Sequence, residues 1–196
     1  MRVLITGAGG QVGTELVDVF AIGGHEVAGF AHGSLDITDR DAVRAAVVEF
    51  HPDAIVHSAA WTAVDACEGD PDRAYAVNAM GTRFIVESAR LVGAAVHYIS
   101  TDYVFDGTKD SPYLEWDATN PQSVYGASKL AGERELDDGS SILRTSWVCG
   151  FHGPNMVKTI LRLAGENEFL SFVADQRGCP TFADDLAAMI ARIVVD

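Results

Sequence analysis

Short apolar runs that favour strands alternate along the chain with longer runs that have the hydrophobic periodicity of helices. The predicted strands comprise residues 2–6, 25–31, 54–58, 95–100, 141–145 and 169–173. The predicted helices comprise residues 11–22, 39–50, 71–91, 123–136, 155–163 and 183–195. Strands that alternate with helices of about ten or more residues indicate a parallel sheet covered on both faces. With right-handed crossovers, this pattern predicts an α/β fold with a doubly wound, Rossmann-like parallel sheet.

Two connections add detail to this pattern. Thr38 precedes the second predicted helix and is the expected N-cap of that helix. The stretch 101–121 is rich in Asp, Gly and Pro and is longer than a usual connection. Connections of that length are often functional, so we expect a functional role for this one.

A glycine-rich turn follows the first predicted strand and opens the first predicted helix. Its glycines have the spacing G-x-x-G-x-x-G, and the turn contains Gly7, Gly10, Gln11, Val12 and Gly13. Glycine allows a tight turn and lets backbone N–H groups approach a pyrophosphate, while the helix N-terminus adds a favourable dipole. The spacing alone is weak evidence, because a tight turn without a ligand can share it. Its position in the first strand-to-helix turn predicts a dinucleotide phosphate site.

The end of the second predicted strand bears on the choice of dinucleotide. An acidic residue usually lies about 20 residues after the glycines and binds the ribose 2′-hydroxyl of NAD. Here the strand ends at Phe30 and Ala31, and the first acid that follows is Asp36. Because an uncharged strand end does not repel a 2′-phosphate, we expect NADP(H) to be preferred, with NAD(H) tolerated.

Tyr125 and Lys129 are four residues apart in a predicted helix, so they share one face. Reduction of a carbonyl group needs a hydride donor and a proton donor. A free tyrosine has a pKa of about 10, and a nearby ammonium group favours the phenolate and lowers that pKa. We therefore expect Lys129 to lower the pKa of Tyr125 and to hold the ribose of the nicotinamide. Thr101 or Ser100, at the end of the fourth strand, suits a hydrogen bond to the substrate oxygen.

Composition narrows the classes of partner and the cellular compartment. The formal net charge is -14, which argues against nucleic acid and anionic membranes as partners. The cysteines Cys67, Cys149 and Cys179 are far apart and form no disulfide framework or zinc motif. No run approaches the roughly 18 apolar residues of a membrane span, and the first apolar run is too short for a signal peptide. The cytoplasm is therefore the expected location.

Several longer motifs make the chain similar to a known family. They are TGAGGQVG at residues 6–13, LDITD at 35–39, SAAWTAVDACE at 58–68, VN at 77–78, ISTDYVFDG at 99–107, YGASKLAGE at 125–133, LRTSWV at 143–148 and DQRGCPT at 175–181. With these motifs the chain resembles the extended short-chain dehydrogenases and, within them, the dTDP-4-dehydrorhamnose reductase family. The match extends over nearly the whole chain.

The resemblance implies a role for individual residues. It implies a catalytic triad of Thr101, Tyr125 and Lys129. Besides the glycine turn and the pair Tyr125 and Lys129, the implied cofactor contacts are Asp36, Ile37, Ala59, Ala60 and Thr62. The implied contacts of the sugar nucleotide are Val64, Thr101, Asp102, Tyr103, Phe105, Trp147 and Asn155. Asn78 is expected to be structural or adjacent to the cofactor.

Some members of this family bind magnesium at a dimer contact through an acid that corresponds to Glu15. A solvated carboxylate favoured by the helix dipole is the preferred explanation of Glu15, so we expect no metal, and a homodimer stays open. Two positions depart from the family's usual pattern. His57 and Ser58 stand where Asn and Ala are usual, and Cys149 stands where Tyr is common.

The resemblance also implies a division of the chain. Residues 1–150 are expected to form the NAD(P)-binding Rossmann domain. Residues 151–196 are expected to form a partial substrate-binding region packed on the same domain. Because chains of the family continue well beyond this C-terminus, we expect the substrate lobe to be incomplete.

The implied reaction is NAD(P)H-dependent reduction of the 4-keto group of dTDP-4-dehydro-L-rhamnose to dTDP-L-rhamnose. Two alternatives stay open. One is another nucleotide-sugar reductase, epimerase or dehydratase of the same superfamily, although Tyr103 after Asp102 weakens the dehydratase reading. The other is a non-catalytic NAD(P)-binding regulatory subunit. A phosphate-binding NTPase is excluded because no Gly-Lys-Ser/Thr follows the glycine turn.

Overall fold

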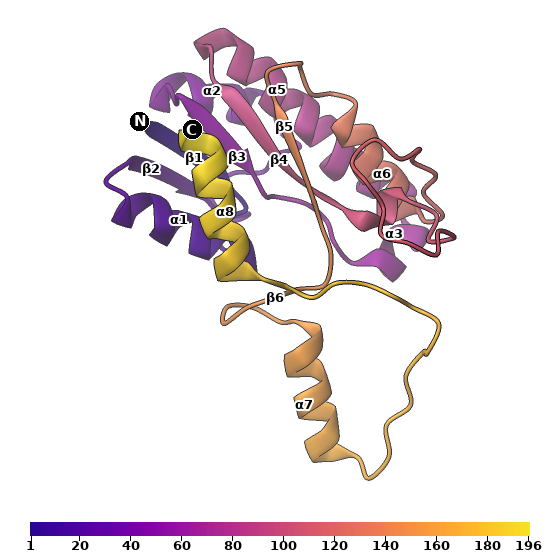
Figure 1. Cartoon of the computed structure of the whole chain (residues 1–196). Helices are drawn as coiled ribbons and strands as arrows, with labels where there is room; N and C mark the ends of the chain where they lie inside the picture. Colours follow the sequence, from indigo (N-terminus) through magenta and orange to yellow (C-terminus); the bar gives the residue numbers. More distant parts are fainter.

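The computed structural model describes residues 1–196 and contains a five-stranded parallel sheet in the order β2-β1-β3-β4-β5. These strands are β1 (Arg2–Thr6), β2 (Glu26–Phe30), β3 (Ala54–His57), β4 (Ala95–Thr101) and β5 (Ser141–Thr145). The chain runs from β1 outward to β2 and then crosses back to β3, so the strand order reverses beside β1. The predicted doubly wound α/β fold is confirmed (Figure 1).

Helices cover both faces of this sheet because β1 and β3 are apolar on both sides. On one face, Val3 and Ile5 pack with residues of α1 (Gln11–Ile22) and α8 (Ala183–Val195). On the other face, Leu4 packs with α2 (Arg40–Phe50) and α5 (Gly81–Val92). A further helix, α6 (Val124–Glu133), packs against β4, whose carboxyl end lies at the candidate site (Figure 1).

Several short elements lie outside this framework. Helix α3 (Val64–Gly69) forms within a stretch for which no element was predicted. The predicted helical stretch 71–91 is confirmed as α4 (Pro71–Tyr75), a π-helical turn at Ala76–Met80 and α5, which follow one another without a break; the π-turn itself was not predicted. The π-turn contains the buried Asn78, whose hydrogen bonds to distant segments cannot be read from a local pattern.

Two further predictions are wrong in their details. No strand forms at residues 169–173, because this segment has no strand edge to pair with and its apolar side chains are exposed. A short parallel pair forms instead from β6 (Val148–Cys149) and β7 (Thr181–Phe182). Asp39, rather than Thr38, caps α2 by accepting hydrogen bonds from the N–H groups of the first turn. Thr38 instead donates two hydrogen bonds to the carboxylate of Asp36, one from its backbone nitrogen and one from its hydroxyl.

The last part of the chain contains two helices in different surroundings. Helix α7 (Met156–Glu166) has no buried residue and extends away from the sheet (Figure 1). Helix α8 packs on α1, and its Ala187, Ile190 and Val194 belong to the same core as β1 and β3. The division of the chain at residue 150 stays a prediction. None of the helices is both long and apolar enough to cross a membrane.

The position of α8 generates a stability prediction. Ile190 is 0% exposed, so Ile190→Ala should leave a cavity and lower the free energy of unfolding by about 2–5 kcal/mol. Ile193, on the same helix, is 42% exposed, and Ile193→Ala should change it by less than about 0.5 kcal/mol. Urea unfolding followed by circular dichroism measures both. Equal effects of the two substitutions would show that α8 is not part of the core.

Candidate active site

The predicted site residues gather at the carboxyl ends of the parallel strands, where doubly wound folds bind their ligands. Thr6 ends β1 and leads into the glycine turn, and Thr101 ends β4. Thr145 ends β5 and is level with Thr101 across the sheet. Helix α6 places Tyr125 and Lys129 beside the carboxyl end of β4. Because the sheet is parallel, the first turn of α1, which follows β1, lies at the same end of the strands.

The glycine turn needs glycine at two positions for packing. Gly7 has a φ of 69°, and a Cβ there would lie 2.7 Å from the backbone nitrogen of Ala59. A Cβ on Gly13 would clash with the carbonyl oxygen of Gly7. These contacts press the turn against β3 and seat the start of α1, which substitution by any larger residue would disturb.

The start of α1 is open to an anion. Gly10 is its N-cap, with extended backbone and no side chain to bond the free N–H groups of the first turn. The first turn contains no acidic residue. Gly9 and Gly10 are exposed. The predicted phosphate contacts of Gly10, Gln11 and Val12 therefore lie on a bare helix N-terminus, the arrangement that favours phosphate.

A hydroxyl side chain and a carboxylate side chain fix the start of helix α6. Ser123 is the N-cap and accepts a hydrogen bond of 3.1 Å from the backbone nitrogen of Gly126. Glu68, from α3, accepts a hydrogen bond of 2.7 Å from the backbone nitrogen of Val124. Gly126 packs so closely on the Tyr103 carbonyl that a Cβ would clash. The helix that carries the predicted acid–base pair is thus fastened to the segment that follows β4.

Tyr125, Lys129 and Thr101 are all buried, at 8%, 2% and 5% exposure. The backbone nitrogen of Tyr103 donates a hydrogen bond of 3.2 Å to the Thr101 hydroxyl. The Tyr103 ring meets the Tyr125 ring edge-on, with centroids 5.6 Å apart. The structure therefore brings together Thr101, Tyr103 and Tyr125 from two separate motifs.

Burial controls the protonation of Tyr125. Desolvation raises the pKa of Tyr125 to about 12, although a side-chain hydrogen bond with Thr101 acts in the opposite direction. The expectation that Lys129 lowers this pKa is wrong for this structure, because burial dominates. A phenol with this pKa is fully protonated at neutral pH, so it can donate a proton.

The Lys129 ammonium group lies in an unusual position for a charge. It donates a hydrogen bond of 2.7 Å to the carbonyl oxygen of Ile99 and lies 3.9 Å from the centroid of the Tyr98 ring. Burial lowers the pKa of Lys129 to about 7, and the negative charge of Glu133 opposes that shift. Lys129 therefore gains and loses its proton in the physiological range.

A buried histidine lies beneath this group. His57 is 0% exposed, and its two ring nitrogens lie 2.6 Å from the Thr6 hydroxyl and 3.2 Å from the Thr82 hydroxyl. Its ring packs on Tyr98, with centroids 5.5 Å apart. Burial, with a contribution from the charge of Lys129, lowers the pKa of His57 to about 3. At neutral pH it is an uncharged link between β1, β3 and α5.

Asn78 has a structural role in this site. Its side-chain oxygen accepts a hydrogen bond of 2.8 Å from the backbone nitrogen of Trp61. Its side-chain nitrogen donates to the Ser128 hydroxyl at 3.0 Å and to the Trp61 carbonyl at 3.1 Å. Ser128 in turn donates to the carbonyl of Tyr125 at 2.8 Å. The segment after β3, which contains Ala59, Ala60 and Thr62, is thereby tied to the helix of Tyr125.

The ion pair between the buried Glu133 and the half-buried Arg144 was missed by the sequence reasoning. Arg144 donates two hydrogen bonds to the Glu133 carboxylate, at 2.9 Å and 2.7 Å, and Ser100 donates a third at 2.5 Å. Arg144 also lies over the Phe105 ring, 5.0 Å from its centroid. Both residues are in quoted motifs, but only their positions on α6 and β5 reveal the contact. Because Ser100 is engaged here, Thr101 is the better candidate for the substrate oxygen.

The remaining predicted contacts of the cofactor and the sugar nucleotide differ in how far their side chains are exposed to solvent. Tyr103, Trp147 and Thr62 are exposed, whereas Val64, Asp102, Phe105, Asn155, Ala59 and Ala60 are half-buried. Phe105 stacks on Tyr113 with centroids 4.2 Å apart, so its ring is turned toward the 101–121 connection. Trp147 has a φ of 49°, a strained conformation of the kind that gathers at functional sites. Asp36 is exposed and Ile37 is buried. These contacts stay predictions.

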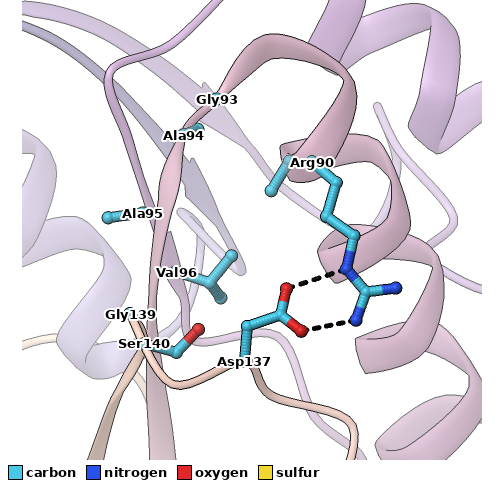
Figure 2. A pocket seen from close by; sticks show the side chains of 9 residues that line it. Arg90, Gly93, Ala94, Ala95, Val96, Asp137, Gly139 and Ser140 are labelled. Carbon is cyan, nitrogen blue, oxygen red and sulfur yellow. Dashed lines mark hydrogen bonds and ion pairs between the residues drawn. The ribbon is translucent and has the colours of Figure 1, made fainter.

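A surface pocket of about 260 Å³ lies at the other end of the strands, where β4 and β5 begin. It is lined by Val96 at the start of β4 and by Gly139 and Ser140 before β5, and Arg90 and Asp137 form an ion pair across it (Figure 2). It lies at the amino ends of the strands, where this class of fold does not bind its ligand. No cluster of three or more His, Cys, Asp or Glu side chains could hold a metal ion.

Comparison with known proteins identifies the family. A family model described as the RmlD substrate binding domain matches residues 1–196. This chain belongs to that family. A dTDP-4-dehydrorhamnose reductase of Aggregatibacter actinomycetemcomitans is 44% identical over 196 residues, which are 98% of this chain and 67% of the relative. One of Streptomyces griseus is 44% identical over 98% of this chain and 64% of the relative. The chain spans about two thirds of the length of these relatives.

Solved structures agree with this assignment. A dTDP-4-dehydrorhamnose reductase of Bacillus anthracis str. Ames, solved in complex with NADP, has a TM-score of 0.94 and 43% identity, covering 100% of this chain and 71% of that one. The reductase of Clostridium acetobutylicum has a TM-score of 0.96 and 41% identity, covering 100% and 70%. The UDP-glucose 4-epimerase of Thermus thermophilus, at 24% identity and a TM-score of 0.82, shares the fold. The resemblance to the reductase family is confirmed.

The buried ammonium group generates a prediction about stability and pH. Burial lowers the pKa of Lys129 from 10.5 to about 7, so between these values the unfolded chain binds more protons than the folded chain. The Lys129 contribution to the free energy of unfolding therefore rises with pH, by roughly 1 kcal/mol per pH unit. Lys129→Met should remove this rise, so its stabilisation relative to the unmodified chain should be largest near pH 7 and shrink toward pH 10.

Urea unfolding of both proteins across this pH range measures the difference. Lys158→Met, at an exposed position, is the control and should leave the pH slope unchanged. A difference between Lys129→Met and the unmodified chain that stays constant with pH would contradict the lowered pKa.

Proposed function

We propose that this chain is the NADP(H)-binding part of a reductase that converts the 4-keto group of dTDP-4-dehydro-L-rhamnose to the alcohol of dTDP-L-rhamnose. One observation carries the proposal. The Thr101 and Tyr125 hydroxyls meet at the carboxyl end of β4, at the same edge of the sheet as the bare N-terminus of α1. This arrangement occurs in a chain that is 44% identical to enzymes with that name.

The residues present fit a nicotinamide dinucleotide. The uncapped first turn of α1 offers backbone N–H groups of Gln11 and Val12 to a pyrophosphate. At the end of β5, the Thr145 hydroxyl is buried and has no hydrogen-bond partner within the protein. Such a group is costly unless something bonds it, and a bound molecule at this edge would supply that bond.

The surroundings of β2 favour NADP(H) over NAD(H). No acid lies between the end of β2 and Asp36. One oxygen of Asp36 accepts hydrogen bonds from the backbone nitrogen of Thr38 at 2.9 Å and from its hydroxyl at 2.7 Å. Those bonds lower the pKa of Asp36 and hold its carboxylate against its own turn. The related reductase of Bacillus anthracis was solved with NADP.

The bound dinucleotide supplies the hydride, and the protein supplies the proton and the orientation. Tyr125, protonated because burial raises its pKa to about 12, donates its proton to the carbonyl oxygen as negative charge develops there. Thr101 donates a hydrogen bond to the same oxygen and fixes its position. Lys129, at the next turn of α6, is proposed to hold the ribose of the nicotinamide.

The proposed partner is the nucleotide sugar, with a homodimer as the proposed assembly. We propose the cytoplasm as its location, because all three cysteines are free thiols, as is usual in a reducing compartment. With a net charge of -14, the chain offers no general attraction for a nucleotide sugar. Binding therefore depends on individual side chains at the site. We propose that these are the predicted contacts of the sugar nucleotide, which are Val64, Thr101, Asp102, Tyr103, Phe105, Trp147 and Asn155.

Tyr125→Phe tests the proton donor. The substitution removes one hydroxyl and should lower the rate of keto-sugar reduction by about 100-fold or more while leaving the Kd for NADPH within about twofold. The decrease of NADPH absorbance with dTDP-4-dehydro-L-rhamnose measures the rate. The exposed Tyr75→Phe is the control. Unchanged turnover in Tyr125→Phe would remove Tyr125 from the mechanism.

The same assay separates the proposed reaction from its alternatives. Turnover of other nucleotide-linked keto sugars, but not of this one, would favour another member of the superfamily. Tight NADPH binding without oxidation by any keto sugar would favour a non-catalytic regulatory subunit.

Cofactor preference is tested by fluorescence titration. Because the end of β2 contains no acid to repel a 2′-phosphate, NADPH should bind at least as tightly as NADH. A glutamate introduced by Ala31→Glu should weaken NADPH binding by about tenfold, since one repelled charge at short range is worth about 1 kcal/mol or more. Much tighter binding of NADH by the unmodified chain would contradict the preference.

A further inference from the structure

Helix α7 is attached to the rest of the protein almost entirely through its first turn. None of its residues is buried, and Val157, Leu161 and Phe169 are exposed on it and after it. The chain leaves the core at β6 and returns at β7 after a long excursion (Figure 1). The orientation of α7 therefore depends on the few contacts that residues 150–158 make with the core.

Those contacts converge on one face of α1. The side-chain nitrogen of Asn155 donates a hydrogen bond of 3.1 Å to the side-chain oxygen of Gln11. Nε2 of His152 lies 3.7 Å from a carboxylate oxygen of Glu15, one turn further along α1. A Cβ on Gly153 would lie 3.1 Å from Cγ of Gln11, so the backbone passes directly over that side chain.

Asn155 joins the two helices through its side chain. Its oxygen accepts a hydrogen bond of 3.0 Å from the backbone nitrogen of Lys158 and so caps α7. Its nitrogen, besides bonding Gln11, donates to the carbonyl of Gly150 at 2.9 Å. The amide thus makes three hydrogen bonds to protein groups, and these fix the start of α7 to the start of α1.

Gln11 has two roles because of its place as the first residue of α1. Its backbone N–H belongs to the uncapped turn that is proposed to bind the dinucleotide phosphate. Its side chain points to Asn155 and the start of α7. A phosphate that fixes the backbone of this residue restricts its side chain too, and the restriction passes to α7 through one hydrogen bond.

We propose that Gln11 is a positioning residue that couples NADP(H) on the glycine turn to the orientation of α7, whose N-cap Asn155 is one of the predicted contacts of the sugar nucleotide. This inference rests on the proposed function, since it takes NADP(H) as the ligand of α1. By linkage, a substrate that needs α7 in this orientation binds more tightly after the cofactor, and the cofactor binds more tightly after the substrate.

Hydrogen exchange of the full chain, with and without NADP⁺, tests the coupling without any need for substrate. Gln11→Met keeps the length of the side chain but removes its amide. Asn155→Ser keeps a hydroxyl that can cap α7 but is too short to reach Gln11. Asn167→Ser, at the other end of α7, is the matched control, because Asn167 bonds only its own helix.

Without nucleotide, both Gln11→Met and Asn155→Ser should exchange several-fold faster than the unmodified chain over residues 150–158. The double variant should be no faster than Asn155→Ser, which also loses the hydrogen bond to the Gly150 carbonyl. Asn167→Ser should match the unmodified chain there. With NADP⁺, exchange in residues 150–158 should slow by about fivefold or more in the unmodified chain and by less than about twofold in the two variants. Residues 7–13 should be protected in all of them.

The outcomes separate the two proposals. Protection of residues 7–13 without any change in residues 150–158 of the unmodified chain would overturn the coupling and leave the proposed function intact. Equal slowing of residues 150–158 in Gln11→Met would overturn it as well. Protection of neither segment would remove NADP(H) from the proposed function and the coupling with it.

Discussion

The polar groups buried at the end of β4 are the constraint on which the site depends. A buried ammonium or carboxylate is stable only when the protein satisfies its hydrogen bonds. Lys129 is held by the Ile99 carbonyl and the Tyr98 ring. Glu133, one turn further along α6, is held by Ser100 and Arg144. These bonds fasten α6 to β4 and β5, and they leave Thr101 and Tyr125 together at the end of the strand.

The same burial determines the chemistry that the proposed catalytic residues Tyr125 and Lys129 can do. Desolvation raises the pKa of Tyr125 and lowers that of Lys129, since in each case it disfavours the charged form. The tyrosine keeps the proton that reduction requires, and the lysine changes its charge near neutral pH. The proposed proton donor and the titratable lysine thus lie on one helix that is packed tightly against the sheet.

Local signals made much of the framework predictable from the sequence. The bounds of α1, α8, β1 and β5 were predicted correctly: glycines flank α1, acidic residues lie in the first turn of α8, and short apolar runs form the two strands. The glycine turn and the spacing of Tyr125 and Lys129 were visible for the same reason. Failure came where distant contacts decide: the apolar run 169–173 found no strand to pair with, and the π-turn at Ala76–Met80 serves hydrogen bonds to other segments.

The direction of the Tyr125 pKa shift and the partners of the buried polar side chains could not be predicted from the sequence either. The spacing of Tyr125 and Lys129 indicated a lowered tyrosine pKa, but the depth of burial reversed the direction. Glu133 and Arg144 are separated by 11 positions in the sequence. Asn155 and Gln11 are separated by 144 positions. Neither pairing has a periodicity or a spacing that a single sequence displays.

Hydride transfer to the sugar is the central claim, and isotope labelling tests it most directly. The chain would be incubated with dTDP-4-dehydro-L-rhamnose and with NADPH in which both hydrogens at C4 of the nicotinamide are replaced by deuterium. The proposed mechanism predicts deuterium bound to C4 of the sugar in dTDP-L-rhamnose, detected by NMR and mass spectrometry. Bound NADPH with no deuterium at that carbon would contradict it.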